Sequence, residues 1–539
     1  MSRIGQGLVV VLVIVVAAGV GATADVATAT AGENATTPKI VAVYPNPVAH
    51  GDAGEFLTLS VPDGTDLGTY RLGDDDSETA LPNRTVGGRV VLTANESAVP
   101  DSVDGPMLEV EGVPALANGG ETLRLSGPDG DVTTVRYADA PEGEVLRPSG
   151  DRRWRPLGAT TFEPIKGGGG TARAFTLPDA PGVPLAVLDR ADRRLLLAGY
   201  TLTSERVVDQ LIAARERGVA VEVLVDGAPV GGLTNRSAAA LDRLVAANVT
   251  VTVLGGKSAR YRFHHAKYAV VDDRAVVLTE NWKPAGTGGA SSRGWGAVVD
   301  TATVVDGLVR TFRADSNGRG ARPWEQFRAD ATIEPAAPTS GRYPTRIEPR
   351  TVEVERTELL VAPDNAAGRV EDLLANATDS IRIVQVSIGG RDDRLLREAI
   401  AAAERGVEVQ ILLSSAWYTR EDNRRLVADL RSVAGREGVA LSVRLADPGG
   451  RYEKIHAKGV IIDGDTVVLG SLNWNDNAYE NNREVALVLH GQDVGAYFGE
   501  VFERDWRGGI TLVPAGSLAA PLIAATPTAL LARRIEFDE

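Results

Sequence analysis

Two segments of the chain carry the same polar residue types at nearly the same spacing. The shared set is a histidine, a lysine, an aspartate, a hydroxyl residue and an asparagine: His265, Lys267, Asp272, Thr279 and Asn281, then His456, Lys458, Asp463, Ser471 and Asn473. Side chains two residues apart in a strand point to the same face. Each histidine and its lysine are therefore expected to project into one pocket.

These residue types suit chemistry at a phosphodiester. Imidazole can attack phosphorus and can exchange protons near neutral pH. Two lysines and the asparagine amides can stabilise the negative charge that grows on the phosphate oxygens in the transition state. Two histidines facing each other across the phosphorus would divide the work, because one becomes a phosphohistidine while the other protonates the leaving oxygen and then deprotonates water.

The elements that would position these residues are repeated as well. Glu404-Arg405-Gly406-Val407 copies Glu216-Arg217-Gly218-Val219 at an offset of 188 residues, and His456 follows His265 by 191 residues. So constant an offset means that one unit is used twice. Within each unit, apolar strands such as 219–225 alternate with amphipathic helices such as 203–217. This alternation predicts an α/β fold with a mixed or largely parallel sheet.

With these features the chain resembles the phospholipase D superfamily, whose hallmark is a duplicated H-x-K-x4-D motif followed by G-S/G-x-N. The resemblance covers residues 183–508. It implies metal-independent cleavage or transfer without a cofactor, in one active site built from both halves, so that a monomer suffices. By position, it gives catalytic roles to the histidines, the lysines and Glu484, and it gives substrate contacts to the remaining polar residues: Asn281, Asn473, Ser471 and Thr279.

The two copies are unequal. The first is one residue shorter, so Asn281 is expected to reach the phosphate less well, and no glutamate stands at the place that matches Glu484. In the family, that carboxylate holds the second nitrogen of a nearby histidine. Either Glu280 or Asp300 takes this role in the first copy, or His265 works without a carboxylate. The carboxylate Glu484 in the second motif favours His456 as the nucleophile. The family pattern favours the histidine of the N-terminal copy, His265, and both assignments stay open.

Asp272 and Asp463 have a different expected role. Each follows an apolar strand and precedes a turn. We expect both carboxylates to stabilise the fold at these junctions and not to touch the substrate.

Residues 36–140 consist of short alternating runs broken by Pro, Gly and Asp turns, which predicts a small all-β sandwich of the immunoglobulin type. The segments 44–47, 54–59 and 116–123 resemble a lamin-tail domain, and we interpret the region as a binding or spacer module. Pro- and Gly-rich residues at 141–182 and 321–352 are expected to be linkers. They would separate the first half, 183–320, and the second half, 353–508.

The chain ends predict export. Residues 1–30 have Arg3, an apolar run over 8–20 and small residues after it, which is the layout of a signal peptide. Residues 509–539 are a candidate C-terminal membrane anchor, although three prolines weaken it as a helix. An extracellular or cell-surface location with membrane association is therefore expected.

Composition excludes several classes of site. The chain has no cysteine, which excludes disulfides and thiolate metal sites, and its five histidines show no H-x3-H spacing. Its net charge is -15, with seven lysines against 50 arginines. This acidic, lysine-poor balance is typical of a salt-loving source and argues against tight binding of a polyanion.

Three functions fit these features. The first is an exported phosphodiesterase of the phospholipase D type that acts on phospholipid. The second is a secreted nuclease of the same superfamily. The third is a non-catalytic surface binding protein whose altered first motif has lost activity.

Overall fold

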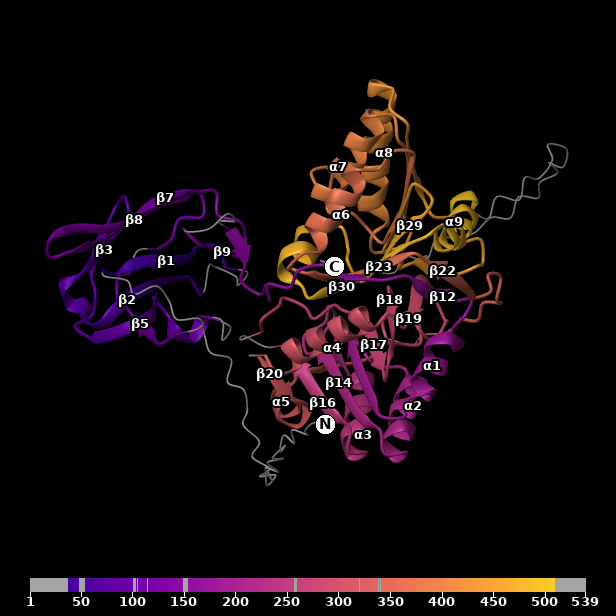
Figure 1. Ribbon diagram of the computed structural model, residues 1–539, viewed down its shortest axis with the longest axis horizontal. Helices are drawn as coiled ribbons and strands as arrows, with labels where there is room; N and C mark the ends of the chain where they lie inside the picture. Colours follow the sequence, from indigo (N-terminus) through magenta and orange to yellow (C-terminus); the bar gives the residue numbers. More distant parts are fainter. Residues whose placement is uncertain are drawn as a thin grey trace, which may run out of the picture.

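The computed structural model describes residues 37–508, apart from 48–53, 100–102, 104, 114, 149–153, 256–258, 319, 338 and 340. The predicted signal peptide (1–30) and the candidate C-terminal anchor (509–539) lie outside the described residues. Among the helices that are described, none has the length and apolar character needed to cross a membrane. Figure 1 shows a strand-rich N-terminal region beside a larger α/β body.

The N-terminal region contains two sheets that share one apolar core. The six-stranded sheet consists of β1 (Lys39–Tyr44), β2 (Phe56–Asp66), β5 (Thr85–Thr93), β6 (Met107–Glu109), β9 (Glu144–Leu146) and β10 (Trp154–Pro156). The four-stranded sheet consists of β3 (Arg71–Gly73), β4 (Glu78–Ala80), β7 (Gly120–Gly127) and β8 (Gly130–Ala138). Alternate residues of β2 and β7, such as Leu57 and Leu123, are buried in the core between them. The prediction of a small all-β unit is confirmed.

The first half of the α/β body combines a parallel and an antiparallel set of strands. Its parallel strands are β13 (Arg194–Gly199), β14 (Ala220–Asp226) and β16 (Thr250–Leu254), and its antiparallel strands are β17 (Tyr268–Val271), β18 (Arg274–Leu278) and β19 (Ser292–Val299). Its helices are α1 (Gly182–Asp189), α2 (Glu205–Glu216), α3 (Asn235–Ala246) and α4 (Ala302–Ser316). Val207, Val208 and Leu211 form the buried stripe of α2, as their spacing predicted.

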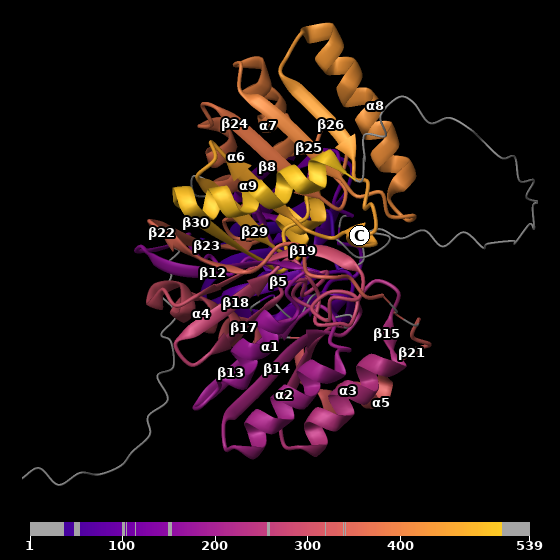
Figure 2. The same cartoon turned by 90° about the vertical axis from the view of Figure 1, so that its right-hand side faces the viewer.

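The second half repeats this order. Its parallel strands are β24 (Ser380–Gln385), β25 (Glu408–Leu413) and β26 (Leu441–Leu445), and its antiparallel strands are β28 (Gly459–Ile462), β29 (Thr466–Gly470) and β30 (Glu484–His490). Its helices are α6 (Ala366–Ala375), α7 (Arg394–Glu404), α8 (Arg420–Glu437) and α9 (Gln492–Arg507). The predicted pair of α/β units is confirmed, and Figure 2 shows them stacked one above the other.

The two expected linkers are wrong in part, because both contribute strands to the body. From 141–182, β11 (Ile165–Gly167) pairs with β23 (Arg356–Ala362), and β12 (Gly170–Leu177) pairs with β19 and with β22 (Arg350–Val354). From 321–352 come β20 (Ala321–Pro323), α5 (Trp324–Asp330), β21 (Ile333–Glu334) and the start of β22. A Cβ atom on Gly169 would lie 2.8 Å from the carbonyl oxygen of Val354. The glycine run therefore allows close backbone packing and does not mark a flexible segment.

The two halves are joined by one core that lies between their sheets. Side chains from β17, β19, β23, β28 and β30 pack there with residues of α4 and α9. The ring of Trp295 lies 4.8 Å from that of Phe498, and a Cβ atom on Gly459 would lie 2.3 Å from the Trp295 ring. Because both halves bury their apolar surface in this core, one chain holds both motifs in a fixed relation.

Asp272 and Asp463 occupy equivalent turns, at the ends of β17 and β28. Asp272 accepts backbone N–H bonds of 2.9 Å from Asp192, Arg193 and Arg194. Asp463 likewise accepts the N–H groups of residues 378–380, at 2.7 to 3.2 Å. Both have left-handed backbones, with φ of 53° and 51°. Burial would raise the pKa of Asp272, but the backbone N–H groups lower it below its ordinary value. Both aspartates therefore have the structural position expected of them.

We predict that Asp272→Ala lowers the free energy of unfolding by about 2–3 kcal/mol, because it removes three charge-assisted backbone hydrogen bonds. Chemical denaturation at neutral pH measures this loss. Asp273→Ala is the matched control, since the neighbouring side chain is 76% exposed, and it should stay near the wild-type value. Because the folded pKa of Asp272 is depressed, its contribution should be lost as the pH falls through that pKa. Equal stability of the two variants would contradict the assigned role.

Candidate active site

The segment that leads into each histidine is hydrogen-bonded to the other half of the chain. The N–H of His265 donates to the carbonyl of Arg483, and the N–H of His456 donates to the carbonyl of Arg293, both at 2.9 Å. β27 (Lys454–Ile455) pairs in parallel with the start of β19, at Ser292. A side chain at the start of the last strand of one half therefore reaches the histidine of the opposite half.

His265 is held by a carboxylate from the second half. Its Nδ1 lies 2.9 Å from both carboxylate oxygens of Glu484, and its ring packs edge-on against Tyr200 with centroids 4.7 Å apart. Burial lowers the pKa of His265 to about 4, although Glu484 acts in the opposite direction. Burial would raise the pKa of Glu484, but His265 and Lys267 hold it below its ordinary value. The pair is thus a neutral imidazole on an ionised carboxylate.

His456 is held by a carboxylate from the first half. Its Nδ1 lies 3.3 Å from Glu280 Oε2 and 3.2 Å from the carbonyl oxygen of Thr279. Burial and then Lys458 lower the pKa of His456 well below its ordinary value. Burial raises the pKa of Glu280 to about 7. Glu280 therefore holds its proton below about pH 7, and the imidazole of His456 is neutral.

This crossed pairing corrects two expectations. Glu484 supports His265 and not the histidine of its own motif, so the support that favoured His456 as the nucleophile belongs to His265 instead. Glu280 does supply the second carboxylate, but it supplies it to His456. Asp300 is exposed at the far end of β19 and takes no part. The pairing could not be read from motif spacing, because it depends on which strands meet between the halves.

Glu280 also occupies the space of a missing side chain. Gly294 in β19 is the counterpart of Glu484 in β30, since each directly follows an arginine that bonds the opposite motif. A Cβ atom on Gly294 would lie 2.2 Å from Glu280 Cγ. The carboxyl of Glu280 therefore fills the volume that a glutamate at position 294 would need. The signal in the sequence was a glycine at 294 together with a glutamate where the second half has Leu472.

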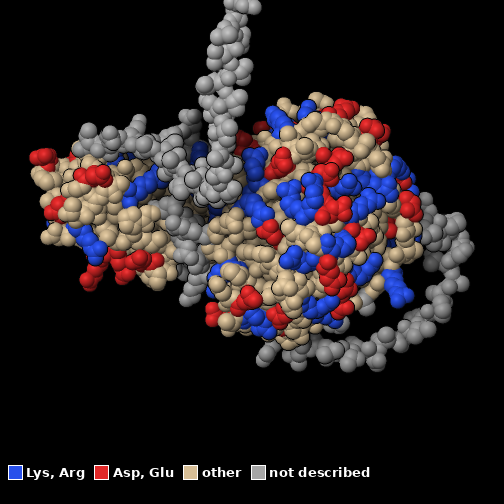
Figure 3. Space-filling model, turned by 60° about the horizontal axis from the view of Figure 1, so that its bottom comes forward, with Lys and Arg blue, Asp and Glu red and all other residues tan. Residues whose placement is uncertain are grey.

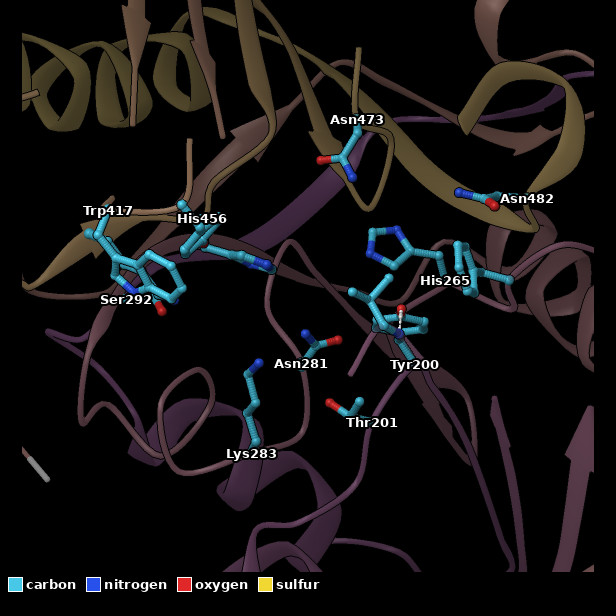
Figure 4. Close-up of a pocket in the computed structure, with 14 residues that line it drawn as sticks. Tyr200, Thr201, His265, Asn281, Lys283, Ser292, Trp417, His456, Asn473 and Asn482 are labelled. Carbon is cyan, nitrogen blue, oxygen red and sulfur yellow. Dashed lines mark hydrogen bonds between the residues drawn. The ribbon is translucent and has the colours of Figure 1, made fainter. Parts of the chain in front are cut away.

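One pocket contains both histidines. Its walls are formed by polar and aromatic side chains from both halves: Tyr200, Thr201, Val230, Phe263, His265, Asn281, Lys283, Ser292, Trp417, Tyr418, Lys454, His456, Asn473 and Asn482. In Figure 4, Asn473 and Asn281 lie on opposite sides of the gap between the histidines. The Oδ1 atoms of these two asparagines accept no hydrogen bond from any described residue. Both amides are therefore placed to contact a bound group.

The expectation that Asn281 would fall short is wrong. The missing residue of the first motif lies in the turn after β17, where Asp272 and Asp273 stand against three residues after β28. That turn is at the end of the hairpin away from the pocket, so the strand still delivers Asn281 to the pocket wall.

Four predicted site residues lie behind the pocket wall. The ammonium groups of Lys267 and Lys458 are buried, and each donates to the carbonyl of the histidine in its own motif. The hydroxyls of Thr279 and Ser471 are also buried, and they accept the backbone N–H of Trp295 and Val485 at 2.9 and 3.0 Å. The prediction that Thr279 and Ser471 bind substrate is therefore wrong, because both hydroxyls bond the neighbouring strand.

Two buried arginines support the crossed strands from behind. Arg483 pairs with Asp315 at 3.0 Å and with Asp364 at 2.9 Å, and Arg293 pairs with Asp505 at 2.9 Å and with Asp179. Arg293 is 1% exposed and lies outside the pocket lining, so its guanidinium serves the interior of the fold. These ion pairs fix the two strands that carry the histidine contacts.

The sequence also left several pocket residues unassigned. Lys283, Lys454, Tyr200 and Trp417 line the pocket but lie outside the motifs. The available signal for the lysines was their two-residue spacing from Asn281 and His456. Among the described residues, Trp417 is the large hydrophobic side chain that stays exposed, at 74%.

Comparisons with known proteins agree with this geometry. A family model described as "Cardiolipin synthase, PLD-like domain" matches residues 185–315 and 370–506, one segment in each half. A mitochondrial cardiolipin hydrolase of Xenopus tropicalis is 28% identical over 144 residues, which are 27% of this chain and 62% of that protein. A probable phospholipase D of Caenorhabditis elegans is 24% identical over 344 residues, which are 56% of this chain and 59% of that protein. The chain thus spans less than two thirds of either relative.

Two solved structures match the chain with low scores. The phosphatidylserine synthase of Haemophilus influenzae is 14% identical with a TM-score of 0.47, over 62% of this chain and 84% of that one. The phospholipase D family member Nuc of Salmonella typhimurium is 18% identical with a TM-score of 0.26, over 30% of this chain and 98% of that one. With its family match falling on both α/β halves, and with the paired motifs meeting in one pocket, the chain belongs to the phospholipase D superfamily.

Proposed function

We propose that this protein is an exported phosphodiesterase that cleaves phospholipid through a phosphohistidine on His265, without a metal ion or cofactor. One observation carries the proposal: two histidines from different halves share a pocket, and each has a carboxylate from the opposite half at its Nδ1. Two such pairs provide one nucleophile and one proton donor. The same arrangement argues against the non-catalytic alternative, because the altered first motif still supplies His265 and Asn281 to the pocket and Glu280 to His456.

In the first step, Nε2 of His265 attacks phosphorus. Glu484 accepts the hydrogen bond of Nδ1–H, which leaves the Nε2 lone pair free and stabilises the positive charge that develops on the ring. The amides of Asn281 and Asn473 contact the phosphate oxygens, and the buried ammonium groups of Lys267 and Lys458 act electrostatically from behind.

His456 completes the step. With the proton on Glu280, Nδ1 of His456 accepts and Nε2–H faces the substrate, so Nε2 protonates the leaving oxygen as its bond to phosphorus breaks. Nδ1 then takes the Glu280 proton and can donate to the carbonyl of Thr279. Nε2 of His456 now accepts a proton from water, whose oxygen attacks phosphorus and breaks the bond to His265. A phosphomonoester is released, and the proton returns to Glu280.

Three observations support phospholipid as the substrate. Two sequence relatives are named as a cardiolipin hydrolase and a probable phospholipase D. Trp417 is 74% exposed at the pocket, and tryptophan suits a membrane interface because one end of its ring is apolar and the other polar. The net charge of -15 disfavours approach of a long polyanion. Export rests on the sequence of residues 1–30, and the N-terminal sandwich is proposed to be a lamin-tail-like binding or spacer module.

A covalent trap tests the proposal. With bis(4-nitrophenyl) phosphate, whose leaving group needs no protonation, His456→Ala should accumulate a phosphoryl group on His265, because water activation is lost. His265→Ala should show none, and intact-protein and peptide mass spectrometry at alkaline pH detects the difference. A phosphoryl group on His456, or none in either variant, would overturn the assignment.

Parallel assays of the wild type on phospholipid micelles and on DNA, both with a chelator present, decide the substrate. Turnover of DNA alone would replace the phospholipid proposal by the nuclease.

The pH profile should be bell-shaped. His265 must be unprotonated to attack, so activity should rise as the pH increases through about 4. Glu280 must hold its proton, so activity should fall as the pH increases through about 7. Glu280→Gln should remove the falling limb near neutral pH and reduce kcat, while Glu484→Gln, the matched control, keeps that limb and lowers activity about 10–100-fold. If activity still falls near pH 7 in Glu280→Gln, Glu280 is not the group whose proton the reaction needs.

Placing the carboxylate on β19 provides a sharper test of Glu280. Glu280→Leu should lower activity about 10–100-fold, as expected for loss of a residue that orients a catalytic histidine. Gly294→Glu alone should destabilise the fold, because its Cβ would lie 2.2 Å from Glu280 Cγ. The double variant should recover activity and restore the falling pH limb, since it recreates the arrangement of Glu484. A double variant that folds normally but is no more active than Glu280→Leu would show that Glu280 does not act through His456.

A further inference from the structure

The lysines of this chain are concentrated at the pocket. Only seven of its 539 residues are lysine. Two of them, Lys267 and Lys458, belong to the motifs, and two more, Lys283 and Lys454, line the pocket wall. The chain uses arginine for nearly all its positive charge, yet four of its seven lysines lie at this site. This concentration indicates that the site needs the compact ammonium group of lysine and not the planar guanidinium of arginine.

Lys283 and Lys454 lie beside the motif residues on the pocket wall. Lys454 stands in β27, two residues before His456, so its side chain follows the same face of the segment as the histidine. Lys283 follows Asn281 through a tight turn, in which the N–H of Lys283 donates to the carbonyl of Asn281 at 2.8 Å. Figure 4 shows Lys283 below Asn281, on the His456 side of the gap between the histidines. Both lysines therefore lie beside the residues that would hold the scissile phosphate.

The position of Lys454 is fixed by its surroundings. Its Nζ lies 4.7 Å from the centroid of the Tyr418 ring, and β27 is hydrogen-bonded to the start of β19. Lys283 and Lys454 are both half-buried. An anion that binds between them would gain more than it would from exposed lysines, because water screens the charges less.

The cations are confined to one end of the pocket. The counterpart of Lys454 in the first motif is Phe263, and the counterpart of Lys283 in the second motif is Asn475. Figure 4 places Tyr200 near His265, and Trp417, Ser292 and Lys283 on the side of His456. Aromatic side chains thus lie at both ends of the pocket, whereas the two lysines that line it lie toward His456. In an in-line reaction with His265 as nucleophile, the leaving alcohol lies at the His456 end.

We propose that Lys283 and Lys454 form a second phosphate subsite, which selects compact phosphodiesters whose leaving alcohol carries another phosphate. This inference rests on the proposed function, because the end of the pocket that receives the leaving alcohol follows from the roles of the two histidines. The subsite supplies one pair of ammonium groups, enough for one more phosphate. On the face shown in Figure 3, basic and acidic side chains are interspersed over the α/β body, which disfavours a long nucleic-acid strand there.

Product-like alcohols test the subsite directly. Glycerol 3-phosphate and glycerol are compared as inhibitors of bis(4-nitrophenyl) phosphate hydrolysis by wild type, Lys283→Gln, Lys454→Gln and the control Lys166→Gln. Lys166 is exposed in β11, away from the pocket. Wild type and the control should bind glycerol 3-phosphate more tightly than glycerol. Each pocket variant should raise the inhibition constant of glycerol 3-phosphate about tenfold, the loss expected for one charge-assisted hydrogen bond.

Several outcomes would overturn the subsite. Inhibition constants that stay unchanged in both pocket variants, or equal inhibition by glycerol and glycerol 3-phosphate, exclude it. Calorimetric titration in which His456→Ala weakens the binding of glycerol 3-phosphate and Lys454→Gln does not would place the inhibitor phosphate at the catalytic centre instead. The two pocket variants are also assayed on a trinucleotide and on a glycerolipid with two phosphates. If they lose more activity on the trinucleotide than on the lipid, the subsite belongs to nucleic acid and the choice of a compact substrate is overturned.

Failure of the proposed function is recognised separately. If wild type hydrolyses no phosphodiester, calorimetric titration of glycerol 3-phosphate into wild type and the same variants still measures the subsite. Binding that is weakened about tenfold by Lys283→Gln and Lys454→Gln, and not by Lys166→Gln, would support the subsite even then. Absence of binding to wild type would exclude it.

Discussion

The hydrogen bonds between each histidine segment and the last strand of the opposite half are the constraint on which the site depends. They place Arg483 beside His265 and Arg293 beside His456, and so they decide which carboxylate meets which imidazole. Neither half contains a complete histidine and carboxylate pair by itself. The common core, with Trp295 packed on Phe498, keeps this crossing in register because both sheets bury apolar surface in it.

Burial then gives the two similar pairs opposite protonation states. Glu484 is ionised because His265 and Lys267 lie beside it, whereas Glu280 is dominated by the loss of solvent and holds its proton to about pH 7. The imidazoles are neutral in both pairs. One pair therefore offers a free lone pair and the other a proton, which is the division of labour that a two-step displacement needs. The ion pairs of Arg293 and Arg483 hold the strands that carry these contacts.

Much of the architecture was predictable because a repeated unit and alternating apolar periods are local signals. The α/β halves, the all-β region and the structural positions of Asp272 and Asp463 follow from them. The crossed carboxylates were not predictable, since they depend on contacts between residues about 200 positions apart in the chain. Composition wrongly predicted a linker at Gly167–Gly170, where the glycines allow close packing of the backbone. Motif matching wrongly predicted substrate contacts for Thr279 and Ser471, whose hydroxyls accept backbone N–H groups of the neighbouring strands.

The fusion of both halves in one polypeptide has a consequence for how the site can diverge. In a symmetric pair of identical subunits, every substitution appears twice, so a helpful change near one histidine must be tolerated near the other. Here each half can vary alone. A glutamate at 280 in place of one at 294, and lysines on one side only, are differences that a pair of identical subunits could not confine to a single wall of its pocket.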